Sequence, residues 1–72
     1  MHKEMDEDDV RGLESYVDKY GLQEVLSKLS YICGEKATHI AENWQDTKTA
    51  KVWTWASSFL DRASAAVETR GV

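Results

Sequence analysis

The 72-residue sequence contains no proline and only one cysteine, Cys33. Because proline interrupts helices, its absence allows long helical segments. The single cysteine excludes an internal disulfide and a multi-cysteine zinc site. A chain of this length buries only about 60% of the surface that its unfolded form exposes. Since disulfides cannot supplement so small a core, a partner subunit is a possibility from the start.

Long hydrophobic runs and clusters of basic residues are also missing. No apolar run approaches the roughly 20 residues of a membrane helix, so we expect no membrane partner. The first residues, MHKEMDEDD, lack the apolar segment of a signal peptide, which favours a cytoplasmic protein with a reduced thiol. The formal net charge is −4, and the nine basic residues are scattered from Lys3 to Arg70. This pattern argues against a nucleic-acid partner.

Apolar residues recur at helical spacing in three segments, which predicts an all-α fold. We expect a flexible acidic tail at residues 1–7 and a single helical domain at residues 8–72. Its helices should span about 9–20, 22–43 and 47–69. Asp8 or Asp9 is suited to cap the first helix and Asp46 the third. Gly21 separates the first two helices because glycine adopts the left-handed conformation that ends a helix.

The short turn before residue 47 predicts that the second and third helices form a long antiparallel hairpin. Facing residue numbers should then sum to about 91, which places Lys36 against the ring of Trp55. The first helix is half as long as the hairpin and should pack on its base, leaving residues 43–51 poorly covered. The expected facing residues are Leu22, Val25, Leu26, Leu29, Ile32, Cys33, Ala37, Ile40 and Trp44, and on the third helix Val52, Ala56, Phe59, Leu60, Ala63, Ala66 and Val67.

The aromatic residues Trp44, Trp53, Trp55 and Tyr31 are candidates for an interface, because large aromatic side chains concentrate in cores and in binding hot spots. Trp53 and Trp55 are two residues apart, so their directions on a helix differ by about 160°. Either one packs inward while the other lies along an edge, or one of them, preferentially Trp53, forms an interface. Tyr31 is expected to be exposed opposite the apolar face.

A second candidate interface is a strip of small side chains along one flank of the second helix. Gly34 lies inside this helix, where glycine costs roughly 1 kcal/mol relative to alanine. The strip either allows close approach of a helix of the same chain or forms a groove for a helix of another chain. Its residues are Ser30, Gly34, Ala37 and Ala41, and Ser57 and Ser64 form a similar line on the third helix.

No residue pattern predicts catalysis, a cofactor or a metal site. Glu35, His39, Glu42 and Asp46 form one polar stripe, which is typical of the solvated side of a helix rather than of a metal site. Cys33 lies on the apolar face as a small hydrophobic residue, and His39 points roughly 120° away from it. A nucleophilic cysteine needs a nearby histidine. We therefore do not expect an enzyme.

The stretch from Tyr20 to Trp55 contains the segments YGLQEVL, ICGEKATHIAENWQD and AKVW. This pattern resembles a set of short bacterial proteins of the kind found on chromosomes, plasmids and phages. The resemblance covers roughly half of the chain and implies a bacterial or phage origin. It carries no activity, cofactor or site residue over to this chain.

These observations lead to two main hypotheses about function. The first is a non-enzymatic protein–protein interaction module, a homodimer joined through the Trp44/Trp53 end or through the strip of small residues. The alternative is an acidic inhibitor or regulator that occupies a basic surface of a partner protein through residues 4–9. A third, weaker hypothesis is a small apolar ligand bound between the helices.

Overall fold

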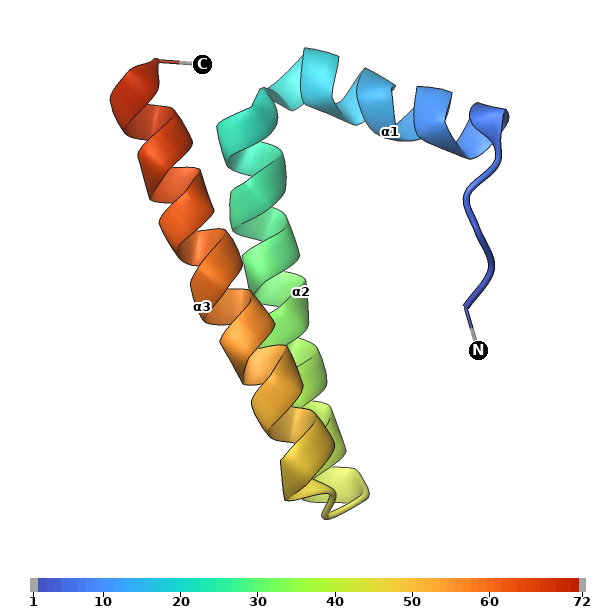
Figure 1. The fold of residues 1–72 in the computed structure, drawn as a ribbon, viewed down its shortest axis with the longest axis vertical. Coiled ribbons are helices and arrows are strands. Elements are labelled where there is room, and N and C mark those ends of the chain that lie inside the picture. The colour runs from blue at the N-terminus through green and yellow to red at the C-terminus, as the bar shows by residue number, and fades with distance from the viewer. Residues whose placement is uncertain (1, 72) are drawn as a thin grey trace.

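The computed structural model describes residues 2–71 and contains three helices, α1 (Glu7–Tyr20), α2 (Leu22–Asn43) and α3 (Thr47–Arg70). The predicted all-α fold is confirmed. Helices α2 and α3 pack along their length as an antiparallel hairpin (Figure 1). Helix α1 leaves the first turn of α2 at a large angle, so the molecule has the outline of the letter L.

Local hydrogen bonds fix the start of α1 at Glu7, two residues earlier than predicted. Asp6, rather than Asp8 or Asp9, is the N-cap. The Asp9 N–H donates to Oδ1 of Asp6 at 2.8 Å, and the Asp6 N–H donates to Oδ2 of Asp9 at 3.2 Å. This reciprocal pair is a capping box, which satisfies two backbone N–H groups at once. Glu7, expected in the acidic tail, therefore belongs to the helix.

Gly21 ends α1 and starts α2 without an intervening residue, as its position predicts. Its N–H donates to the Val17 carbonyl at 2.8 Å, and its carbonyl accepts from the Val25 N–H at 3.2 Å. The backbone there has φ 89° and ψ 150°, a conformation open to glycine and strained for other residues. This residue of positive φ turns the chain away from the hairpin rather than folding α1 back onto it.

The first helix accordingly contacts α2 only near Gly21, at the corner of the L, and within residues 2–71 it makes no contact with α3. The structure buries no residue of α1. The expectation that α1 covers the hairpin base holds only at this corner, and the apolar side chains of Val10 and Leu13 remain exposed. A one-residue connection cannot provide the reversal that fuller coverage requires.

The contact between α2 and α3, which we call the seam, consists mainly of small side chains. Its buried residues are Ser30, Cys33, Ala37, Ala50 and Ser64. Trp53 and Leu60 lie beside them and are half-buried. No large side chain is fully buried in the described part of the chain. The hairpin therefore has a narrow strip of buried atoms in place of a filled core.

Serine hydroxyls link the two helices across the seam. Ser30 Oγ donates to the Ser57 carbonyl at 2.7 Å, and Ser57 Oγ donates to the Ser30 carbonyl at 2.8 Å. One end of the hairpin is linked by Ser64 Oγ, which donates to the Gln23 carbonyl and accepts from Gln23 Nε2, both at 3.1 Å. Because buried hydroxyls are costly without partners, these bonds hold the helices in a single register.

The predicted contact between Lys36 and Trp55 is wrong, because α2 and α3 pack in a different register. The residue numbers of both bonded pairs sum to 87, about one helical turn from the predicted 91. The Lys36 ammonium lies over the ring of Trp53, 5.9 Å from its centroid. The cation–π contact thus forms with the neighbouring tryptophan.

The predicted seam face of α3 is also partly wrong. Val52 is 62% exposed and Phe59 54% exposed, although both were expected to face α2. The helix is rotated so that the small residues Ala50, Ser57 and Ser64 face α2 instead. Apolar periodicity does not detect serine, which enters a seam when its hydroxyl can bond to a carbonyl of the facing helix.

Candidate protein interaction surface

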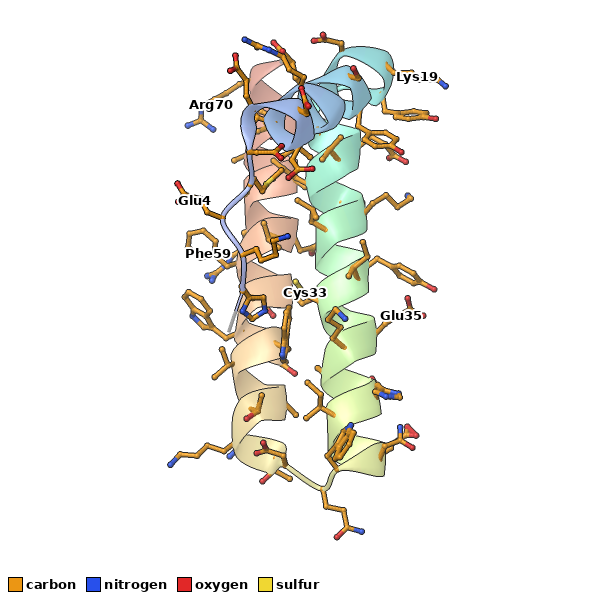
Figure 2. All side chains as sticks on the ribbon, turned by 90° about the vertical axis from the view of Figure 1, so that its right-hand side faces the viewer. Glu4, Lys19, Cys33, Glu35, Phe59 and Arg70 are labelled. Atoms are coloured by element: carbon orange, nitrogen blue, oxygen red, sulfur yellow. The ribbon has the colours of Figure 1, made fainter. Side chains whose placement is uncertain are left out.

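An apolar groove lies where α1 projects from the hairpin. Leu13 and Tyr16 of α1 line one wall, and Val25, Leu29 and Ile32 of α2 line the other. Glu24 and Lys28 stand at its rim as an ion pair of 3.0 Å. The groove has a volume of about 470 Å³ and is open to solvent. Figure 2 looks onto this side of the hairpin, with α1 pointing toward the viewer.

The apolar surface continues from the groove onto α3. Lys36 lies one turn beyond Ile32 on α2, and its ammonium reaches the Trp53 ring. Trp53 is followed at helical spacing by the half-buried residues Ala56, Leu60, Ala63 and Val67. We call this side of the hairpin the inner face, defined by Val25, Leu29, Ile32, Trp53 and Leu60.

The opposite side of α2, the outer face, is polar. Its groove is floored by Ser30 and Ser57 and lined by Tyr31, Gly34, Glu35, Thr38, His39, Glu42 and Asn43. These groups bond to one another: the Tyr31 hydroxyl donates to Glu35 Oε2 at 3.3 Å, and Asn43 Nδ2 donates to the His39 carbonyl at 3.0 Å. Among residues 2–71, no three metal-ligating side chains converge on one point. The outer face is a solvated helix surface.

The chain exposes far more surface than a compact protein of its mass. Its accessible surface is 6100 Å² for 8.2 kDa, whereas about 4,500 Å² is typical of a folded monomer of that mass. Its radius of gyration is 14.0 Å, against about 11 Å for a compact domain of this length. The excess of about 1,600 Å² has the size of a large subunit contact.

The structure does not bring the four aromatic candidates into one patch. Trp53 is half-buried on the inner face, and Trp44 is 73% exposed at the end of α2. Trp55 packs against Phe59 along the solvent side of α3, with ring centroids 5.6 Å apart. Tyr31 is exposed on the outer face. Trp53 and Trp55 thus lie on different sides of α3, as their spacing of two residues requires.

The strip of small residues belongs mainly to the hairpin itself. Ser30 is 8% exposed and bonded to Ser57, so it is not accessible to another chain. Ala37 is buried in the seam, while Gly34 and Ala41 are half-buried beside it. A Cβ atom added at Gly34 would lie 3.5 Å from Ser57 Oγ, an ordinary van der Waals distance.

Substituting Gly34→Ala is therefore expected to stabilise the protein by about 0.5–1 kcal/mol. The added methyl group fits without displacing Ser57, and alanine reduces the conformational freedom of the unfolded chain. Urea denaturation at a fixed chain concentration measures this change. A loss of stability would mean that α2 and α3 approach each other more closely than the 3.5 Å distance indicates.

The sequence did not reveal that Leu13, Leu29 and Ile32 line one apolar groove, because its apolar pattern assigned Leu29 and Ile32 to the hairpin contact. The width of the apolar face on α2 could have indicated this groove. A helix that faces one neighbour needs a stripe only slightly wider than 100°. The apolar residues of α2 cover the seam and also extend to the groove at Val25, Leu29 and Ile32. A face of that width indicates a second neighbour.

Charge is distributed unevenly between the two parts of the L. Residues 1–20 carry seven acidic and three basic side chains, a net charge of −4, while the six acidic and six basic side chains of the remaining residues cancel. Within α1, Arg11 pairs with Glu7 at 3.5 Å and Glu14 at 3.2 Å. Such exposed pairs contribute little to stability. At the other end of the hairpin, hydrogen bonds from the Thr49 hydroxyl and N–H lower the pKa of Asp46, the N-cap of α3.

No protein-family model, curated protein sequence or solved structure gives a significant match to the chain. The resemblance to short bacterial proteins therefore stays a prediction. None of the helices described at residues 2–71 is long and apolar enough to cross a membrane.

Proposed function

We propose that the protein is a non-enzymatic protein–protein interaction module that associates with a second copy of itself. The observation that carries the proposal is the bare inner face. A stable domain usually consists of two packed layers of secondary structure. In the described part of this chain, the hairpin has nothing packed over Leu29, Ile32 or Trp53 except α1 at one corner.

The exposed area supports a dimer of the two hairpins. A stable interface of standard size buries about 800 Å² per partner, and permanent dimers bury more. The excess surface of about 1,600 Å² per chain is sufficient for the latter class. The face is also largely free of charge, with Lys36 as an exception whose stem can lie along the Trp53 ring.

Sedimentation equilibrium of the full chain over a concentration series tests this proposal. We expect a dimer whose dissociation constant changes little between low and high salt, because burial of apolar surface is weakly sensitive to screening. A chain that stays monomeric throughout the series would contradict the proposal. Dissociation at high salt would point to an electrostatic contact instead of the inner face.

The concentration of negative charge in residues 1–20 favours a second candidate, an acidic regulator that binds a basic partner protein. Its structural support is weaker, since Asp6 and Asp9 already bind backbone N–H groups of α1. Neutralising Glu4→Gln and Asp8→Asn leaves this capping box intact. The double variant should keep its self-association in sedimentation while losing any salt-sensitive binding to a basic protein.

A cytoplasmic location and a bacterial or phage origin belong to the same proposal. The location is supported by Cys33, a buried free thiol without a second cysteine to pair with. The absence of enzymatic activity is proposed because the polar groups of the outer face are bonded to one another, and because Cys33 is buried in the seam. The origin depends only on the resemblance of residues 20–55.

A further inference from the structure

We propose that two copies interlock as antiparallel L-shaped molecules, with α1 of each copy covering the end of the other hairpin where α2 turns into α3. This inference depends on the proposed self-association and specifies its geometry. In this arrangement the two inner faces stack on each other, and the α1 helix of each copy extends across the hairpin of the other copy. Leu13 of one copy then contacts Trp44 of the other, at the end of α2 that its own α1 leaves bare.

Only the inner face of the hairpin is suited to burial. The groove beside α1 is lined almost entirely by apolar atoms of Leu13, Tyr16, Leu29 and Ile32. The outer groove exposes carboxylates, hydroxyls and amides, and several of them, including Glu35, already have local hydrogen-bond partners. Burying the outer face would remove these groups from water without giving them new partners, at a net cost.

Helix α1 is long enough to reach over a second hairpin. Its 14 residues extend for about 21 Å. Packed helices lie about 8–10 Å apart, so a second hairpin stacked on the inner face fits beneath the projecting helix. The inward side of α1, with Leu13 and Tyr16, would then contact the end of that hairpin. This contact gives the apolar stripe of α1 a partner, which its own chain does not provide.

The charge of residues 1–20 selects the relative direction of the two copies. A two-fold axis along the hairpins would place residues 1–20 of both copies at one end, where their net charges of −4 repel. A two-fold axis across the hairpins places them at opposite ends, separated by about the 33 Å length of a 22-residue helix. Screening at physiological salt acts over about 8 Å, so the repulsion then vanishes. Only the antiparallel arrangement also covers Trp44, which is 73% exposed.

Disulfide trapping between two single-cysteine variants tests this geometry. Both variants carry Cys33→Ala, and one adds Leu13→Cys while the other adds Trp44→Cys. Oxidation of a mixture is expected to give a covalent heterodimer as the main product, with little cross-linking of either variant alone. As a matched control, Leu13→Cys mixed with Tyr31→Cys should give no heterodimer, because Tyr31 lies on the outer face. Sedimentation and circular dichroism of each variant verify folding and self-association before oxidation.

The outcomes separate this inference from the proposed function. Cross-linking of Leu13→Cys with itself would overturn the antiparallel arrangement in favour of adjacent α1 helices. Variants that sediment as dimers but give no Leu13–Trp44 heterodimer would overturn the interlock and leave the dimer standing. If the unmodified protein is a monomer at every concentration, both proposals fail and the inner face is free for a different protein.

Discussion

Substituting Ile32→Asp is expected to weaken self-association about 1,000-fold or more. Ile32 is 44% exposed in the single chain and lies in the apolar groove between α1 and α2. Full burial of an aliphatic side chain contributes about 1.5–3 kcal/mol, of which association supplies the part that is still exposed, 44% for Ile32. Burying a carboxylate in its place costs a further amount of about 1–3 kcal/mol or more. Because a two-fold contact contains the residue twice, the total loss is about 4–6 kcal/mol, and every 1.4 kcal/mol is a factor of ten.

The neighbouring substitution Tyr31→Asp provides the matched control. Tyr31 is 63% exposed on the outer face, so the dissociation constant should remain within about threefold of that of the unmodified protein. Sedimentation equilibrium of the two variants and the unmodified protein at one salt concentration makes the comparison. Equal effects of the two substitutions would mean that the inner face is not the interface, and a larger effect of Tyr31→Asp would move the interface to the outer face.

Substituting Ser57→Val is expected to destabilise the folded protein by about 2–4 kcal/mol. The change removes the hydroxyl that donates to the Ser30 carbonyl and leaves Ser30 with poorer hydrogen bonding in the seam. Each lost bond costs about 1 kcal/mol, and an unsatisfied buried group costs about 1–3 kcal/mol.

Ser58→Val is the control for this prediction, because Ser58 is exposed on the same helix and one residue away. Its substitution should change the free energy of unfolding by no more than about 0.5–0.7 kcal/mol, chiefly through the lower helix propensity of valine. Urea denaturation must be compared at one chain concentration, because the apparent stability of a self-associating protein depends on concentration. Similar losses for Ser57→Val and Ser58→Val would show that the serine bonds contribute little to the hairpin.

The Ile32 and Ser57 variants separate association from folding of the hairpin. Ile32 does not take part in the serine bonds of the seam, so helical content of Ile32→Asp should persist at low temperature. Ser57→Val acts on the contact between α2 and α3 and should lower stability at every concentration. Circular dichroism at two concentrations that differ 100-fold distinguishes these behaviours.

The positions of the helices followed from the sequence almost without error. Gly21 ends α1, Asp46 caps α3 and α2 spans Leu22–Asn43, as the spacing of apolar residues and the capping residues predicted. These features depend on contacts within about four residues along the chain, which the sequence displays directly. Helix α1 starts at Glu7, earlier than predicted, because two acidic residues, Asp6 and Asp9, cap it jointly.

The candidate site was less predictable, because residues distant in sequence compose it. The sequence identified Trp44 and Trp53 as surface aromatics and the end of the hairpin as poorly covered. It did not show that Leu13 and Ile32 line one groove, since that depends on the direction in which α1 leaves Gly21. Nor did it show that Ser30 is unavailable, since that depends on the position of Ser57.

By itself, then, the sequence determined an all-α chain of three helices with a hairpin and a short first helix, because helix formation and capping are local. Only the tertiary structure decided which sides of α2 and α3 meet. Apolar periodicity favoured Val52 and Phe59, whereas bonded serines place Ser57 and Ser64 in the seam. The small serine side chains let the two helices approach closely, and their hydroxyls find hydrogen-bond partners in the seam between α2 and α3. With α3 rotated in this way, the inner face of the hairpin stays bare.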